Sequence, residues 1–180
     1  FLIEDCAHGL GSTDKKKHVG NFGVAGVFSF YPTKQITTGE GGVIISNNKK
    51  LMDKIKIIKS IGVNTPPEKR KIQGVYDVTH LGLNYRLTDF QAALAIGQMK
   101  RYEKSLKKRK QNAQYYINEF KKIKDLYIQD YDKEHSYFIL QIFFRNIKIR
   151  NKILSKFKDK KVGSSIHYAT SVPMMSYYKN

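Results

Sequence analysis

A long helical segment that begins at Thr88 limits the folds open to this chain more than any other feature. Thr88-Asp89-Phe90-Gln91 has the pattern of a capping box, in which a Thr caps the helix and a Gln follows three residues later. The segment continues to about Lys122, a length of about 50 Å at 1.5 Å per residue. Such a helix is too long for the core of one domain. The sequence therefore predicts a helix that joins two domains.

Short apolar segments come before this helix. Residues 1–5, 24–30 and 42–46 are predicted strands, and the short turn between the second and third predicts that these two run antiparallel. A helix with an apolar stripe follows, capped by Asn47 or Asn48. The other elements that we expect are loops over 9–23 and 63–83, strands over 136–144 and 164–168, and a helix over 147–158.

The composition excludes several classes of protein. The chain has 180 residues, of which 41% are hydrophobic and 27% charged, which is ordinary for a globular protein. Cys6 is the single cysteine, so no internal disulfide framework can form. We find no stretch of about 18 apolar residues and expect no membrane insertion. We also expect no metal site.

The net charge of +18 raises the question of a nucleic-acid partner. The basic residues are 27 lysines and 6 arginines, and the lysines alternate with isoleucines, as in residues 54–59. Arginine is the residue that favours base readout and bidentate phosphate binding. We interpret the lysines as a solvated surface and expect no specific nucleic-acid partner. A non-catalytic protein that binds partners through its basic surface stays an alternative.

A turn centred on Lys34 carries the clearest chemistry. The lysine lies between two apolar strands, and the hydroxyl and glycine residues of segment 29–42 surround it. A lysine sheltered from water loses its charge more readily, and the neutral amine can form a Schiff base with an aldehyde. Hydroxyls and backbone N–H groups can hold a phosphate. A glycine-rich hairpin whose lysine extends into solvent would explain the same spacing.

Asp5 and His8 supply a second candidate site. A carboxylate at the end of a buried strand is costly unless a cation pairs with it. The protonated ring nitrogen of pyridoxal phosphate (PLP) is such a cation, and the pairing keeps the ring an electron sink. Asp5 as a loop cap and His8 as a surface or core residue stay alternatives. Cys6 fits packing better than chemistry.

Four segments together resemble one known family. They are Ile3-Glu4-Asp5-Cys6-Ala7-His8, Phe28-Ser29-Phe30-Tyr31-Pro32-Thr33-Lys34, Thr37-Thr38-Gly39-Glu40-Gly41-Gly42 and Asn84-Tyr85-Arg86-Leu87-Thr88-Asp89. In this order and spacing they resemble the DegT/DnrJ/EryC1/StrS family of PLP-dependent sugar aminotransferases, which have the type I (aspartate aminotransferase) fold.

The resemblance implies an α/β fold in two parts. Residues 1–100 would form the C-terminal half of the large PLP-binding domain, with part of its mixed, mostly parallel sheet. Residues 101–180 would form the long linking helix and an incomplete, smaller α+β C-terminal domain. The chain starts inside a strand and stops in a loop-like stretch, and family members are roughly twice as long. We therefore expect a fragment of a longer protein.

The resemblance also implies roles for five residues. Lys34 would be the Schiff-base lysine and the base that moves the proton in transamination. Asp5 would pair with the ring nitrogen of PLP, His8 would lie near the ring or its 3-hydroxyl, and Ser29 would bind the cofactor phosphate. Asn84 would reach into the site of a neighbouring subunit, which implies a homodimer.

Four further residues are weaker substrate candidates. Glu40 could orient backbone or contact substrate. Arg86 could have a role in the site, although a structural ion pair explains Arg86 at least equally well. His167 and Tyr168 resemble a late His-Tyr element that lies close to the substrate in some members.

The activity that the resemblance implies is amino transfer, with glutamate as the donor, to a nucleotide-linked keto-deoxy sugar. The products would serve the biosynthesis of cell-surface polysaccharides or related amino sugars, and the enzyme would be cytoplasmic. A rival within the family is a PLP- or PMP-dependent sugar dehydratase. Those members typically have His at the lysine position, so Lys34 argues against it.

Overall fold

The computed structural model describes residues 1–129 and 131–179. The chain divides into two compact units, one made of 1–118 and 130–140 and the other of 119–129 and 141–180. The assignment of 1–100 and 101–180 to two domains of the type I fold stays a prediction.

The first unit is built on a three-stranded mixed sheet. Its strands are β1 (Ile3–Asp5), β4 (Ala25–Ser29) and β5 (Gly42–Ile45), in the order β1-β4-β5. β1 and β4 run parallel, whereas β4 and β5 run antiparallel. The prediction of antiparallel pairing between the second and third strands is therefore confirmed.

Glu4 of β1 fixes the loop that leads into β4. Its carboxylate accepts hydrogen bonds of 2.6 Å from the backbone N–H groups of Gly20, Phe22 and Gly23. These N–H groups, that of Gly23 above all, lower the pKa of Glu4. The loop lies so close to β4 that a Cβ at Gly26 would collide with Gly20.

The loop predicted over 9–23 also contains a small antiparallel hairpin. Its strands are β2 (Thr13–Asp14) and β3 (Lys17–His18), which the sequence did not predict. Two residues on each side are too few to leave a visible alternation of apolar and polar side chains.

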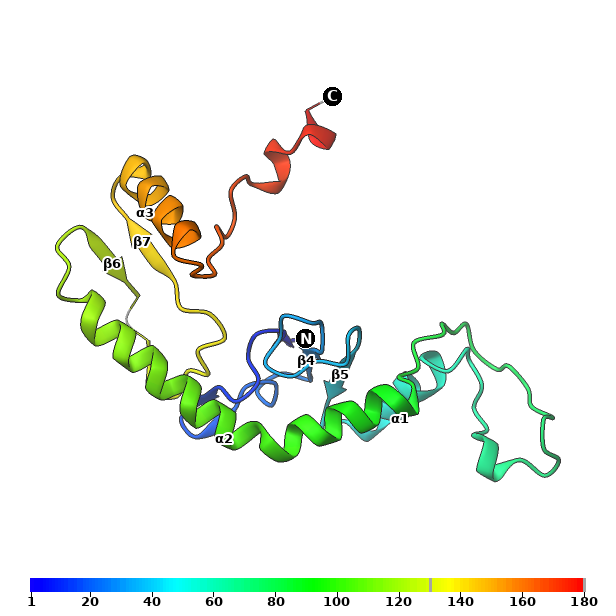
Figure 1. Ribbon diagram of the computed structural model, residues 1–180. Helices are drawn as coiled ribbons and strands as arrows, with labels where there is room; N and C mark the ends of the chain where they lie inside the picture. Colours follow the sequence, from blue (N-terminus) through cyan, green and yellow to red (C-terminus); the bar gives the residue numbers. More distant parts are fainter. Residues whose placement is uncertain (130, 180) are drawn as a thin grey trace. The chain divides into compact units, whose positions relative to one another are not determined.

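Two helices of the first unit begin at the caps that the sequence predicts. α1 (Lys49–Ile58) has Asn48 as its cap, whose Oδ1 accepts from the backbone N–H of Leu51 at 3.1 Å. α2 (Asp89–Phe120) is one continuous helix (Figure 1). The long loop between them contains one short 3-10 helix, η1 (Pro67–Lys69).

The centre of the first unit lies between α2 and the segment that follows β4. Phe30, Ile36 and Tyr102 form a buried cluster, against which Leu10 and Leu106 pack. Because Phe30 and Ile36 flank the Lys34 turn, this core fixes the turn against the helix.

The second unit combines a two-stranded sheet with one helix. β6 (Leu126–Ile128) pairs antiparallel with β7 (Ile142–Phe144), and α3 (Ile147–Asp159) contacts β7. Two 3-10 helices follow, η2 (Val172–Met174) and η3 (Ser176–Tyr178). No helix in the described part of the chain is long and apolar enough to cross a membrane.

One predicted strand is shorter than expected and another is absent. Of the strand expected over 136–144, only β7 forms, because the backbone ahead of it bonds elsewhere: the N–H of Ser136 donates to Ser12 Oγ at 3.0 Å. The segment 164–168 forms no strand.

Candidate functional site

The sheet brings Asp5 and Ser29 to the same edge. In the register of the sheet, Asp5 lies beside Val27, and Ser29 ends β4 opposite Gly42. The carboxyl ends of neighbouring parallel strands meet at one edge of a sheet, which is where α/β proteins bind their ligands. Asp5 Oδ1 accepts from the N–H of Ala7 at 3.0 Å. This edge therefore offers one carboxylate and one hydroxyl.

Lys34 lies in the turn that follows β4 directly. Its N–H donates to the carbonyl of Tyr31 at 3.0 Å, and the N–H of Tyr31 donates to Ser29 Oγ at 3.2 Å. The Lys34 side chain is half-buried, and its Nζ lies 5.2 Å from the centre of the Phe138 ring. The turn thus directs the amine toward an aromatic side chain from a distant part of the chain.

The ring of His8 lies against the same phenylalanine. The two ring centres are 4.1 Å apart with an angle of 24° between the planes, which is a stacked arrangement. One aromatic ring therefore contacts both His8 and Lys34. The sequence did not single out Phe138, and only a long-range contact could have identified it.

Hydrogen bonds of Gln35 and Ser136 join the segments that carry Lys34, His8 and Phe138. Gln35 Nε2 donates to the carbonyl of His8 at 2.9 Å, to that of Leu10 at 3.3 Å and to Ser136 Oγ at 3.2 Å. Ser136 is completely buried. The positions of the Lys34 turn, the His8 loop and the segment before Phe138 are therefore coupled.

Polar side chains along one face of α2 hydrogen-bond to the loop that contains Lys34 and to Leu10. Gln91 Nε2 donates to the carbonyl of Glu40 at 2.9 Å, and Gln98 Oε1 accepts from the N–H of Thr37 at 3.1 Å. The hydroxyl of Tyr102 donates to the carbonyl of Leu10 at 2.6 Å, and burial raises the pKa of Tyr102 to about 12. Their spacing of seven and four residues matches the helical repeat, a signal that the sequence offered and that we missed.

The other residues named from the sequence lie elsewhere in the chain. Asn84 and Arg86 are exposed and contact each other, since Arg86 Nε donates to Asn84 Oδ1 at 3.0 Å. Glu40 is exposed too. His167 and Tyr168 belong to the second unit, where both are exposed and their rings meet edge to face, 5.4 Å apart.

The groups gathered in the first unit have the chemistry that PLP requires. Asp5 offers a carboxylate for a protonated ring nitrogen, Lys34 an amine for an aldehyde, and Ser29 a hydroxyl for a phosphate. The donors come from one sheet edge and from the turn that leaves it. In the described part of the chain no three His, Cys, Asp or Glu side chains gather in a way that could hold a metal ion.

The model of the DegT/DnrJ/EryC1/StrS aminotransferase family matches residues 1–180. The chain belongs to this family. The resemblance drawn from the four sequence segments is therefore confirmed. The expected fold class, an α/β fold with a mixed sheet as in PLP-dependent sugar aminotransferases, is confirmed by the sheet described above and by related structures.

Several curated relatives of the chain carry enzyme names. The chain is 37% identical over 183 residues to the UDP-4-amino-4,6-dideoxy-N-acetyl-beta-L-altrosamine transaminase of Campylobacter jejuni, covering 99% of this chain and 47% of that protein. The chain thus spans about half the length of the curated relatives it matches.

Two solved structures of family members share this fold. The first is Helicobacter pylori PseC, an aminotransferase involved in the biosynthesis of pseudoaminic acid, with 27% identity and a TM-score of 0.79 over 98% of this chain and 47% of that one. The second is the Escherichia coli GDP-4-keto-6-deoxy-D-mannose-3-dehydratase with bound hydrated PLP. It has 26% identity and a TM-score of 0.77 over 88% of this chain and 44% of that one.

Proposed function

We propose that the full-length protein is a PLP-dependent aminotransferase that transfers an amino group from glutamate to a nucleotide-linked keto-deoxy sugar. The observation that carries this proposal is the position of Lys34 in the turn that leaves β4, the strand whose neighbour β1 ends at Asp5 on the same sheet edge. The name of the Campylobacter relative supports a nucleotide-sugar substrate. Because the chain spans half of its relatives, the activity is a proposal about the whole protein.

Asp5 and Ser29 would hold the cofactor. The carboxylate of Asp5 would pair with the protonated ring nitrogen, and the hydroxyl of Ser29 would donate to the phosphate. Bound in this way, PLP supplies a ring that takes up the electron pair of a broken C–H bond. The β1–β4 pairing keeps the carboxylate and the hydroxyl at fixed positions on one sheet edge.

Lys34 would carry the covalent and proton-transfer chemistry. Its amine would hold the cofactor through the aldehyde. When released, it would act as the base toward the C–H bond of the amino donor and, in the second half of the reaction, as the acid toward the sugar carbon that receives the amino group. His8, whose ring stacks on Phe138, would lie near the cofactor ring or its 3-hydroxyl. Gln35 keeps these two segments in register because its amide bonds to the carbonyl of His8.

We also propose a homodimer, with Asn84 reaching the phosphate site of the partner subunit. Exposed apolar side chains flank Asn84: Leu83 is 48%, Tyr85 72% and Phe90 80% exposed. Burying such a patch favours association. Arg86, which is bonded to Asn84, would be carried to the same place and could contact substrate.

The remaining candidates are weaker parts of the proposal. Glu40, His167 and Tyr168 would contact the sugar nucleotide, and all three are exposed. The product would serve polysaccharide or amino-sugar biosynthesis, and the location would be cytoplasmic.

Transfer of labelled nitrogen tests this proposal. The protein is expressed from its complete reading frame and incubated with PLP, ¹⁵N-glutamate and a UDP-linked keto-deoxy sugar, and the mass of the sugar product is measured. We expect ¹⁵N in the product, and a loss of rate of about 10³-fold or more in Lys34→Ala, because one group supplies both nucleophile and base. Lys59→Ala, which changes another half-buried lysine, is the control and should keep the rate. An unchanged rate in Lys34→Ala would contradict the proposal.

Dehydration is a second candidate, because the chain resembles the E. coli 3-dehydratase structure. The same mixture separates the two reactions. A dehydratase would release a deoxygenated keto sugar without ¹⁵N, whereas an aminotransferase would release an amino sugar with it. Lys34 stands where the dehydratases typically have His, so it favours release of the amino sugar that contains ¹⁵N.

A further inference from the structure

One aromatic ring in the first unit contacts two of the residues to which we assign cofactor chemistry. The Phe138 ring stacks on His8 with 4.1 Å between ring centres, and the Lys34 Nζ lies 5.2 Å from its centre. An ammonium group within about 6 Å of a ring centre is attracted by the electrons of the ring face. The three residues come from distant parts of the sequence, so their meeting is a property of the fold.

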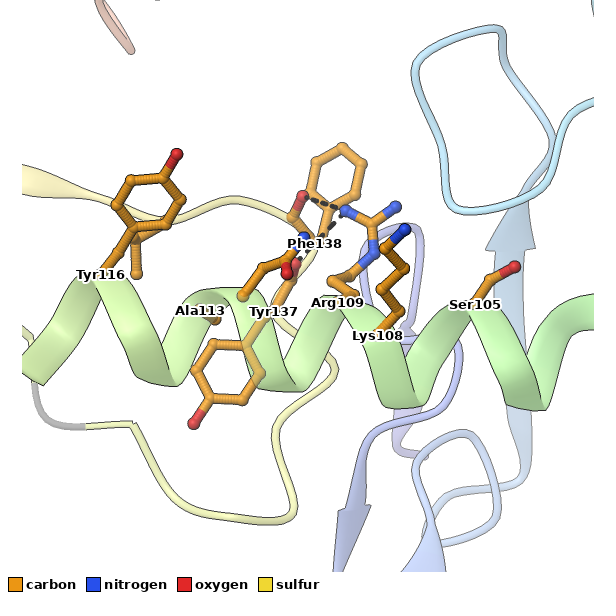
Figure 2. A pocket seen from close by; sticks show the side chains of 9 residues that line it. Ser105, Lys108, Arg109, Ala113, Tyr116, Tyr137 and Phe138 are labelled. Atoms are coloured by element: carbon orange, nitrogen blue, oxygen red, sulfur yellow. Dashed lines mark hydrogen bonds between the residues drawn. The ribbon is translucent and has the colours of Figure 1, made fainter.

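The backbone that carries this ring is anchored to α2. Arg109 Nη1 donates to the carbonyl of Phe138 at 3.3 Å and lies 3.5 Å from that of Tyr137 (Figure 2). Figure 2 also shows the rings of Tyr137 and Phe138 pointing to opposite sides of their segment. Tyr137 is buried, at 6% exposure, and so serves the core, which leaves the Phe138 ring for the other side.

The same segment is tied to the two residues that the ring contacts. Ser136, two residues before Phe138, is buried and accepts a 3.2 Å hydrogen bond from Gln35, the neighbour of Lys34. Gln35 also bonds to the carbonyl of His8 at 2.9 Å. The backbone next to Phe138 is therefore joined to the segments that carry Lys34 and His8.

Phe138 also lines a pocket of about 450 Å³ together with residues of α2. Arg109 and Tyr116 contribute to the same wall (Figure 2). Phe138 therefore contacts Lys34 and His8 and also contributes to the lining of this pocket.

We propose that Phe138 is a positioning residue of the proposed cofactor site. Its ring positions the Lys34 amine and the His8 imidazole, and Arg109 positions the ring. This inference rests on the proposed function, because it is that function which makes Lys34 and His8 part of a cofactor site. The contacts themselves belong to the chain alone, so they can be tested without cofactor.

Amine labelling of the cofactor-free protein, expressed from its complete reading frame, tests the contact with Lys34. Acetic anhydride is added at fixed pH, and mass spectrometry follows acetylation of Lys34 relative to Lys59 in the same molecule. In Phe138→Met, which removes the ring but keeps much of the volume, we expect Lys34 to react about two- to fivefold faster, because the flexible side chain covers the amine less than the ring does. Phe138→Tyr keeps a ring and should restore the original rate.

The proton NMR signals of the His8 ring test the second contact. A stacked ring shifts these signals, so they should move in Phe138→Met and return in Phe138→Tyr. Phe143→Met is the matched control, because Phe143 pairs with Tyr127 in the second unit. If Phe138→Met leaves both the labelling rate and the His8 signals unchanged, or if Phe143→Met changes them equally, the proposal is wrong.

A second variant covers the case in which Phe138→Met does not fold. Arg109→Gln keeps the ring and removes the guanidinium from the carbonyl of Phe138, so both readouts should shift in the same direction by a smaller amount. Unchanged readouts would overturn the proposal. If the wild-type protein takes up no PLP while both readouts respond as expected, the proposed function fails and the positioning role stands.

Discussion

Gln35, the residue after Lys34, links three segments of the first unit through one amide group. Its Nε2 donates to the carbonyls of His8 and Leu10 and to the hydroxyl of Ser136. The hydrogen bonds to Leu10 and Ser136 are partly buried, and water replaces a lost donor poorly at a buried acceptor. The amide therefore contributes to stability as well as to the geometry around Lys34.

Replacing this amide should lower the free energy of unfolding. For Gln35→Ala we expect a loss of about 1–3 kcal/mol, because acceptors are left unsatisfied. Urea denaturation of the protein from its complete reading frame measures the change. Gln114→Ala is the control: Gln114 is exposed on α2 and bonds to Asn118 at 2.8 Å, so its loss should cost less than about 0.5 kcal/mol. An equal loss of unfolding free energy in the two variants would show that the hydrogen bonds of Gln35 do not stabilise the fold.

Glu4 makes stability depend on pH. Backbone N–H groups, first that of Gly23, lower its pKa below the ordinary value of 4.5. A lowered pKa in the folded state means that the stabilisation is complete above about pH 4.5 and is lost as the pH falls through the folded value. Glu4→Gln should be less stable than wild type at pH 7, and the difference should shrink as the pH falls below 4.5. Glu68→Gln, in exposed η1, should match wild type throughout. A Glu4→Gln deficit that does not change with pH would contradict this account.

Among the elements, α2 does most to organise the Lys34 loop, and its first turn shows the expected capping box. Thr88 Oγ1 accepts from the N–H of Gln91 at 3.2 Å, and Gln91 Oε1 accepts from the N–H of Thr88 at 3.1 Å. Gln91 also reaches the carbonyl of Glu40, so the cap and the loop share a side chain.

Loss of the cap should therefore weaken the helix. Thr88→Ala is expected to lower the free energy of unfolding by about 1 kcal/mol, whereas Thr88→Ser, which keeps the acceptor, should lose little. Thermal unfolding of both variants measures this. If Ser and Ala are equally destabilising, the hydroxyl is not the group that matters.

Local signals predicted elements well where the partners lie close in sequence. The cap of α1 at Asn48 and the antiparallel turn between β4 and β5 are such cases. The segment that starts at Ser136 predicted a strand, but the N–H of Ser136 donates to Ser12 and the carbonyl of Phe138 accepts from Arg109. These partners lie over a hundred and about thirty residues away along the chain. No local pattern carries such information.

The same distinction applies to the candidate site. Asp5, Ser29 and Lys34 stand in short motifs, so a sequence can suggest them, and the sheet register then brings Asp5 and Ser29 to one edge. Phe138 lies in no motif that we recognised. It enters the site only because Gln35 and Ser136 join two distant segments.

At the level of the whole molecule, the exposed apolar surface around Asn84 predicts the oligomeric state. We expect the protein from its complete reading frame to elute as a dimer, and the double variant Tyr85→Glu, Phe90→Glu to elute as a monomer, because charge replaces the apolar contact. Light scattering coupled to size-exclusion chromatography measures the mass. Tyr115→Glu, at an exposed position further along α2, should stay dimeric. A dimer that survives the double variant would place the interface elsewhere.

The claim that Lys34 is the lysine that binds PLP can be tested directly by peptide mapping. The protein from its complete reading frame is incubated with PLP, reduced with borohydride to fix the cofactor on its lysine, digested and analysed by mass spectrometry. The chain has 27 lysines, so the position of the added mass is a demanding test. We predict that the mass lies on Lys34 at close to one cofactor per chain. Cofactor mass spread over several surface lysines, or absent from Lys34, would contradict the account.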